Sequence, residues 1–150
     1  MPIKRHKDLQ PISRDHHHAL LLSWKIRQGF SRQIDPARMK KYSDWFYENH
    51  LKPHFEIEEK YLFPIMEENN ELVKKALSEH RRIIKLITAD SDFERTLSLL
   101  EEELENHIRF EERILFKEIQ ERATPEQMKT ISRVHKDEAF VENTEDEFWR

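Results

Sequence analysis

The sequence predicts an all-α fold, an up-down-up-down four-helix bundle with an extra C-terminal helix. The chain of 150 residues contains a single glycine, and few of its residues favour β-strands. Apolar residues recur at intervals of three and four positions, as they do on one face of a helix. The predicted helices are joined by short connections, which favour antiparallel neighbours over long crossovers.

Cap residues bound the first two helices. The first helix is expected over about 13–28, since serine is a good N-cap and Gly29 can adopt the left-handed conformation that ends a helix. The second is expected over about 36–68, because Asp35 can cap it and a proline occupies its first turn. Pro53 lies inside this second helix and predicts a kink.

Turn and cap residues also separate the remaining helices. A two-asparagine turn starts the third helix, over about 70–88. The stretch 90–92 caps the fourth helix, which reaches about residue 122. Residues 124–127 combine a threonine cap, a first-turn proline and a glutamine at the third helical position. This combination predicts a fifth helix over about 125–149.

The predicted helices form one structural unit. No linker or low-complexity segment divides the chain, so we expect one domain over residues 1–150 with the bundle at about 12–122. The fifth helix is an addition to the bundle. Four apolar residues between 140 and 149 give it an apolar surface, so it could pack on the bundle or on a second copy of the chain in a homodimer.

Composition excludes several functional classes. A net charge of −4 argues against nucleic acid and membrane surfaces as partners. No apolar run reaches the roughly 18 residues of a spanning helix, and the first residues contain no apolar signal segment. Without cysteine the chain has no disulfides, zinc ribbons or thiol chemistry, which fits a cytoplasmic protein.

One histidine motif occurs twice in similar surroundings. His54 and His107 are each followed four positions later by a pair of glutamates and then by Leu-Phe. This spacing places His54 and Glu58 on one helical face, one turn apart, and it does the same for His107 and Glu111. A single copy is typical of a surface ion pair, so the repetition is what indicates a shared role.

These polar residues interrupt apolar stripes that should face the core. The stripe of the fourth helix consists of Phe93, Leu97, Leu100, Leu104, His107, Glu111, Ile114 and Leu115. His54 and Glu58 interrupt the second helix in the same way. His80 interrupts the third helix, and His16 interrupts the first. Each helix of the bundle is therefore expected to direct a histidine towards the bundle axis.

Buried imidazoles and carboxylates need partners. Each unpaired buried polar group costs on the order of 1–3 kcal/mol, and an unpaired buried charge costs more. A pair of divalent or trivalent metal ions would satisfy all of them, because two carboxylates can bridge two metals while the imidazoles fill terminal positions. This donor set suits iron or manganese. The sequence therefore predicts a buried metal centre.

The order of these residues resembles that of the hemerythrin-like (HHE cation-binding) family, over about residues 12–119. The resemblance implies that the metal ligands are His16, His54, Glu58, His80, His107 and Glu111. It also implies two iron ions in an oxo- or hydroxo-bridged non-haem di-iron centre at the axis of a four-helix bundle. Members of the family bind dioxygen, sense oxygen or iron, or respond to nitric oxide and oxidative stress.

Two features of the implied ligand set stay open. Oxygen-carrying members have a second histidine four residues after the ligand on the third helix, where this chain has Ile84. His17 or His50 could supply a fifth histidine. Otherwise one iron keeps an extra open position, as in the similar iron-centre repair proteins. On the first helix His16, His17 and His18 are all candidates, and His16 has the best apolar neighbours.

Other residues near the motifs are assigned to packing or to the surface. Glu59 and Glu112 lie about 140° from the ligand face by helical geometry, so we expect them to face solvent. Histidines expected at the surface or behind the ligands are His6, His18, His50 and His135. Aromatic residues expected in the core are Trp24, Trp45, Phe55, Phe63, Phe110 and Phe116.

Three functional hypotheses follow. The first is a di-iron protein that binds dioxygen or nitric oxide for storage or sensing. The second is an enzyme, either a di-iron oxidoreductase acting on peroxide or nitric oxide or a factor that supplies iron to damaged centres. The third is a bundle that holds zinc or no metal and acts through its fifth helix. No substrate pocket can be read from the sequence, so we favour a metal- and gas-binding protein over an enzyme.

Overall fold

Helices make up most of the described chain. The computed structural model describes residues 5–135 and 139–150, and these ranges contain no strand. The α-helices are α1 (Gln10–Ser31), α2 (Pro36–Phe46), α3 (Lys52–Ile57), α4 (Glu71–Ile87), α5 (Phe93–Phe110), α6 (Phe116–Arg122) and α7 (Pro125–Val134). The shorter elements are the 3-10 turns η1 (Lys7–Leu9) and η4 (Phe63–Ile65) and the π-helical turns η2 (Tyr47–Leu51), η3 (Glu58–Leu62) and η5 (Glu111–Leu115). The prediction of an all-helical protein is confirmed.

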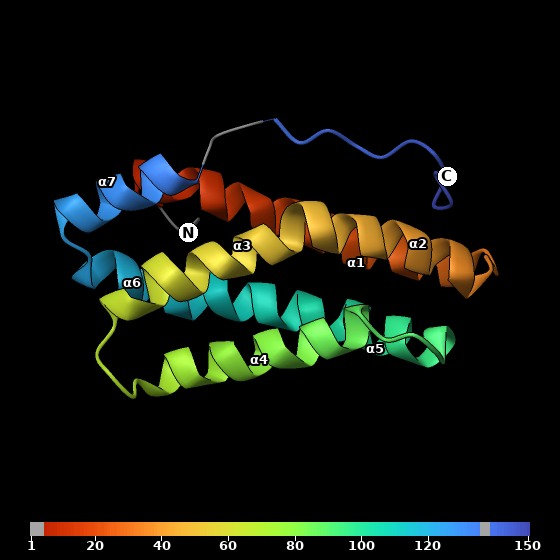
Figure 1. The fold of residues 1–150 in the computed structure, drawn as a ribbon, viewed down its shortest axis with the longest axis horizontal. Helices are drawn as coiled ribbons and strands as arrows, with labels where there is room; N and C mark the ends of the chain where they lie inside the picture. Colours follow the sequence, from red (N-terminus) through yellow and green to blue (C-terminus); the bar gives the residue numbers. More distant parts are fainter. Residues whose placement is uncertain (1–4, 136–138) are drawn as a thin grey trace.

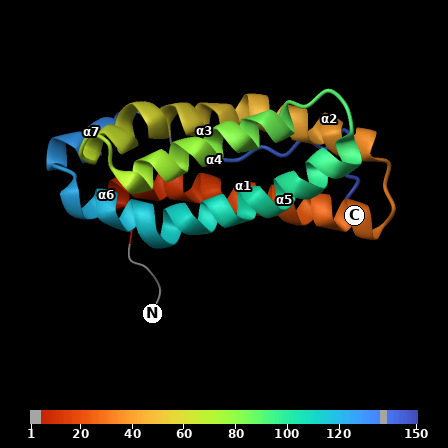
Figure 2. The same cartoon turned by 90° about the horizontal axis from the view of Figure 1, so that it is seen from below.

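The elements join into long runs that lie side by side. α2, η2, α3 and η3 follow one another without a break, as do α5, η5 and α6. Figures 1 and 2 show these two runs beside α1 and α4, with α7 folded back at one end. α5 packs against α1, α2 and α4. The inward faces of these elements enclose the core.

α1 is longer than predicted. It begins at Gln10, before the expected cap Ser13, and continues to Ser31. Gly29 therefore lies inside the helix, and it does not have a positive φ. A Cβ atom at Gly29 would lie 2.2 Å from the Sδ atom of Met39 in α2. The expected left-handed helix end was wrong, because close packing of two helices is what requires glycine here.

The second helical run accommodates Pro53 without ending. The run covers residues 36–65 and stops short of the predicted Glu68, and Asp35 caps it through its side chain as predicted. Pro53 lies in the first turn of α3, directly after η2. Proline lacks an N–H, and its ring crowds the carbonyl four residues earlier, so a wider π-helical turn before it fits the backbone. The irregularity expected at Pro53 is thus a π-helical turn.

The caps of the later helices are largely as predicted. The side chain of Asn70 accepts hydrogen bonds from two backbone N–H groups of α4. Thr124 and Gln127 form a reciprocal capping box at the start of α7. Asp92 precedes α5 with a left-handed backbone (φ 55°) and makes no side-chain cap bond. The fourth run ends at Arg122, where the sequence predicted it to end.

The C-terminal segment (residues 139–150) differs from the prediction. α7 ends at Val134 instead of near residue 149, and the part of that prediction on residues 136–138 lies outside the described residues. The C-terminal segment is not helical, and it runs back along the bundle towards α2 (Figure 1). Phe148 and Trp149 are buried and meet the ring of Tyr42 edge-on. These residues anchor an extended chain to the core, which outweighs a short stretch of weak helical preference.

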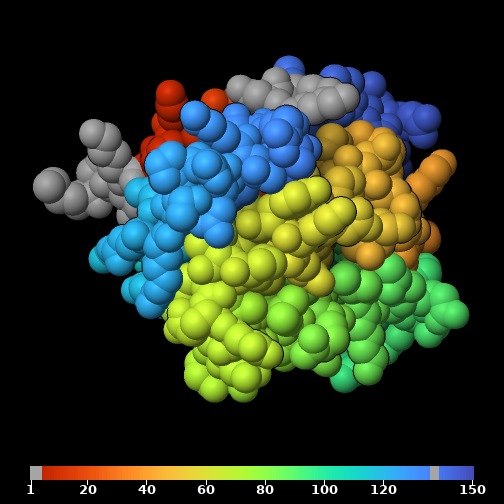
Figure 3. Space-filling model, turned by 60° about the vertical axis from the view of Figure 1, so that its left-hand side comes forward, coloured from red at the N-terminus to blue at the C-terminus, as the bar shows by residue number. Residues whose placement is uncertain are grey.

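The core consists of two apolar clusters. One includes Ile26, Met39, Phe46, Leu100 and Phe148. The other includes Leu9, Leu62, Phe116, Ile119 and Met128. α7 belongs to the second cluster and packs on η1 and η3. Figure 3 shows α7 in blue, next to the red N-terminal segment on one side and the yellow part of the second helical run on the other.

Two residues predicted in the core lie at the surface. Trp24 is 42% exposed and Ile114 is 48% exposed. Ile114 belongs to the π-helical turn η5, whose extra residue shifts the helical register. As a result Leu115 and Phe116 point inward instead. Within the described ranges, none of the helices has the length and apolar character needed to cross a membrane.

Candidate metal centre

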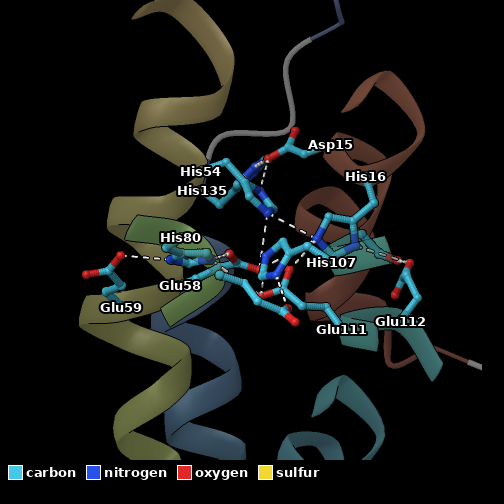
Figure 4. Close-up of polar contacts among 12 residues, drawn as sticks. Asp15, His16, His54, Glu58, Glu59, His80, His107, Glu111, Glu112 and His135 are labelled. Carbon is cyan, nitrogen blue, oxygen red and sulfur yellow. Dashed lines mark hydrogen bonds and ion pairs between the residues drawn. The ribbon is translucent and has the colours of Figure 1, made fainter. Parts of the chain in front are cut away.

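Six polar side chains from four helical runs meet in the interior between the two apolar clusters (Figure 4). They are His16 from α1, His54 from α3, Glu58 from the start of η3, His80 from α4, His107 from α5 and Glu111 from the start of η5. None of the six is more than 3% exposed. The structure thus brings together all six residues that the resemblance implies as ligands.

The first donor group consists of His16, His54, Glu58 and Glu111. The Nε2 atom of His16 lies 3.0 Å from Glu111 Oε1, and that of His54 lies 3.2 Å from Glu58 Oε2. The two Nε2 atoms are 3.1 Å apart. The donor atoms of the group all lie within 4.8 Å of one another, so one ion could contact them all.

The second donor group consists of His80, His107 and the same two glutamates. The Nε2 atom of His80 lies 3.0 Å from Glu58 Oε1, and that of His107 lies 3.3 Å from Glu111 Oε2. Each carboxylate therefore gives one oxygen to the first donor group and the other oxygen to the second. The two donor groups therefore share both carboxylates.

The unpaired atoms of these side chains fit a metal. All four carboxylate oxygens of Glu58 and Glu111 are buried without a hydrogen bond of good geometry, and so are the Nε2 atoms of His80 and His107. Buried polar atoms normally have partners, so a set of unpaired atoms that face one another needs an explanation. Cations between them supply one, because imidazole nitrogen and carboxylate oxygen are metal-ligand atoms.

A carboxylate also lies behind each of the four imidazoles. The Nδ1 atom of His54 donates to Asp15 at 2.9 Å, that of His80 to Glu59 at 2.8 Å, and that of His107 to Glu79 at 2.7 Å. The Nδ1 atom of His16 lies 3.6 Å from Glu112. Such contacts fix the tautomer of the ring, turn the Nε2 lone pair inward and raise the basicity of the ligand.

The sequence contains a signal for two of these outer carboxylates, which the repeated motif does not include. Asp15-His16 and Glu79-His80 are both acid–histidine pairs, and each acid supports a histidine of the next helical run. We expected Glu59 and Glu112 to face solvent, which is right for Glu59 and wrong for Glu112. Glu59 is exposed and Glu112 is half-buried, yet both carboxylates reach an imidazole of another run.

The remaining candidates lie outside the two donor groups. His17 is exposed, and the ring of His18 stacks on Phe140 at 4.1 Å. The ring of His50 also lies against Phe140, at 4.6 Å. Ile84 packs against an apolar cluster. The structure therefore places His16 from the histidine triplet in the centre, and it places neither His17 nor His50 there as a fifth histidine.

Both His-x-x-x-Glu motifs share a backbone feature. Each motif ends where an α-helix changes to a π-helical turn, with Glu58 first in η3 and Glu111 first in η5. π-helical turns are rare, and they are frequent at functional sites. The wider turn begins at the residue whose two oxygens face different donor groups. In both halves of the bundle, the glutamate shared by the two donor groups is the first residue of a π-helical turn.

Electrostatics favour charged side chains in the absence of a cation. Burial by itself lowers the pKa of His54, but Glu58 and Asp15 beside it raise the pKa to about 9. Burial acts in the same direction on His80, and Glu111, Glu58 and Glu59 raise its pKa to about 11. Burial raises the pKa of Glu58 and Glu111, but the surrounding imidazoles hold it below its usual value. A metal would replace the protons that otherwise balance the carboxylates.

Comparison with protein-family models gives a match. A family model described as the hemerythrin HHE cation binding domain matches residues 9–119. No curated protein and no solved structure matches the chain. The matched range contains both His-x-x-x-Glu motifs, His16 and His80, and it covers most of the chain. The chain therefore belongs to the hemerythrin HHE cation-binding family.

Proposed function

We propose that the chain is a non-haem di-iron protein, built as an up-down-up-down bundle, that binds dioxygen or nitric oxide. The observation that supports this most strongly is the division of carboxylate oxygens. Glu58 and Glu111 each give one oxygen to either donor group, so each group has two imidazoles and two carboxylate oxygens. Mixed imidazole and carboxylate ligands suit iron better than they suit magnesium or calcium, because those two ions prefer oxygen ligands alone.

The surrounding residues would hold and screen such a pair of ions. Phe55 stacks on the ring of His80 at 3.8 Å, and Phe116 lies 5.0 Å from the ring of His16. These rings exclude water and fix the imidazoles, while the outer carboxylates orient them. When bound, iron supplies redox chemistry and coordination positions for a small ligand. Four protein donors at each position leave such positions free.

A cavity supports access from outside. A cavity of about 710 Å³ lies between α1, α3 and the C-terminal segment, and its lining includes Asp15, His54 and Phe140. It brings solvent to the outer side of one proposed ligand, while the inner side stays buried. This arrangement suits a small uncharged ligand that can pass between packed side chains. It does not offer a large substrate direct contact with both donor groups.

A second candidate function is redox chemistry on nitric oxide or peroxide, or the supply of iron to damaged centres. Ile84 favours it, because an apolar side chain stands where oxygen carriers have a further histidine. The two donor groups are then equal in their number of histidines. Two ions with equal numbers of histidine ligands, and with room for a small ligand at each, suit catalytic turnover of nitric oxide or peroxide as well as storage of a gas.

The test is a metal and spectral measurement on protein from aerobic, iron-replete expression. We expect about two irons per chain and a visible spectrum that bleaches on anaerobic reduction and returns reversibly with air. Two irons that only oxidise, with catalytic loss of nitric oxide or peroxide, would favour the second candidate. Zinc alone, or less than about a tenth of an iron per chain, would overturn both.

A further inference from the structure

Three of the four outer carboxylates of the centre are themselves held by other side chains. Glu79 behind His107 pairs with Lys75 at 2.6 Å. Glu112 behind His16 pairs with Arg5 at 3.1 Å. Ionic partners of this kind restrict a carboxylate that would otherwise rotate into solvent. The carboxylate behind His54 has a partner of a different type.

Asp15 is held by an imidazole from outside the family domain. His135 donates from Nε2 to Asp15 Oδ2 at 2.6 Å, and the same oxygen accepts from His54 Nδ1 at 2.9 Å (Figure 4). His135 follows α7, beyond the matched residues 9–119. The side chain of Asp15 is 34% exposed, whereas that of His54 is 2% exposed. The contact therefore joins a buried ring to the surface through one oxygen atom.

The position of His135 is fixed by the packing of α7. The capping box at Thr124 starts this helix, and Met128 and Ile131 are buried in the second apolar cluster. The helix packs on η1 and η3, the elements that flank α1 and follow His54. His135 is thus the C-terminal residue of an anchored element, and its ring is 13% exposed.

We propose that His135 is a positioning residue for one of the two metal positions. Its hydrogen bond holds Asp15 against His54, and so sets the orientation and donor strength of a ligand in the first donor group. The second donor group has no described contact of this kind with α7. This inference rests on the proposed metal binding. It makes α7 a part of the metal centre in this chain.

The test is a titration of the metal-free full chain with Co²⁺ alone, followed by visible absorption. His135→Ala should weaken one of two Co²⁺ equivalents by about 3- to 10-fold, less than the 10- to 100-fold typical of residues that touch a ligand directly. His135→Gln should restore the affinity, since its amide can donate to Asp15. Lys129→Ala, an exposed change on α7, is the matched control and should titrate as the unmodified chain does.

A double-mutant cycle separates positioning from a general loss of structure. Asp15→Ala removes the residue through which His135 acts, so adding His135→Ala should weaken Co²⁺ binding no further. Additive losses would overturn the inference, as would His135→Ala titrating like the unmodified chain or His135→Gln failing like His135→Ala. An unmodified chain that takes up no Co²⁺ would overturn the proposed metal binding as well. Circular dichroism confirms that each variant is folded.

Discussion

At the scale of single residues, each buried imidazole lies between two carboxylates. Its Nε2 atom faces Glu58 or Glu111, and its Nδ1 atom faces an outer acid such as Asp15 or Glu79. The outer carboxylate accepts a hydrogen bond from the protonated Nδ1 atom, which leaves the Nε2 atom free to bind a cation. The two inner glutamates are therefore the residues that both donor groups share.

Removal of either inner glutamate should empty the centre. Glu58→Ala or Glu111→Ala takes an oxygen from both donor groups at once, so we expect most of the bound iron to be lost. Iron per chain, measured after purification, checks this. His6→Ala changes an exposed histidine outside both donor groups and should keep the full iron content. Two irons in both glutamate variants would refute the bridging role.

The effect of metal removal should depend on pH. The pKa of His54 is about 9 and that of His80 about 11, both above the ordinary 6.5. Stability from protonated rings is thus fully present below pH 6.5, and it is lost as the pH rises through about 9 and then about 11. Bound metal displaces these protons. The difference in melting temperature between metal-loaded and metal-free protein should therefore widen from pH 6.5 to 9. A constant difference would contradict the assignment.

At the scale of elements, the sequence predictions succeeded where the structure depends on local patterns. Caps such as Asn70 and Thr124 act within one turn, so a local pattern predicts them. The buried histidines were also predictable, because they interrupt a periodic stripe. The π-helical turns η3 and η5 were not, since no residue type marks them. Nor was the role of Gly29, which depends on a residue of another helix.

Because α1 lies close to α2 at Gly29, we expect any side chain at this position to lower the stability of the fold. In Gly29→Ala the new methyl group would meet Met39 Sδ at 2.2 Å and Phe148 at 3.2 Å. Alanine favours the helix by up to about 1 kcal/mol, but overpacking costs about 1–3 kcal/mol, so we expect a net loss of stability. Urea unfolding measures it. Combining Gly29→Ala with Met39→Ala should cost less than the sum of the two single changes.

At the scale of the whole molecule, the C-terminal segment belongs to the core. Its Glu142 pairs with Lys25 of α1, and its Asp146 makes two hydrogen bonds to Arg38 of α2. Trp149 lies over the Lys25 ammonium group at 4.2 Å. The segment therefore contacts both α1 and α2 and holds them together on the side opposite α5. The apolar residues of this segment are evident in the sequence, but a helix was predicted there. The prediction was wrong because these residues make their contacts at long range, with α1 and α2.

Stability should follow the buried rings of this segment. Phe148→Ala removes a ring that is 2% exposed, and we expect a loss of about 3–5 kcal/mol in the free energy of unfolding. Val141→Ala, at a residue that is 75% exposed, should change it by less than about 0.5 kcal/mol. Equal effects of the two substitutions in urea unfolding would show that the segment contributes nothing to the core.

The division of donors between the two halves of the chain has a consequence for assembly. Residues 10–65 supply both imidazoles of the first donor group, and residues 71–122 supply both imidazoles of the second. Each half adds one carboxylate that both groups share. Neither half contains a complete donor group. If the chain were divided at the turn around residue 69, each fragment would therefore lack one of the carboxylates that its donor group needs. Each donor group is therefore complete only when the two halves pack together, and a metal bound there would link them.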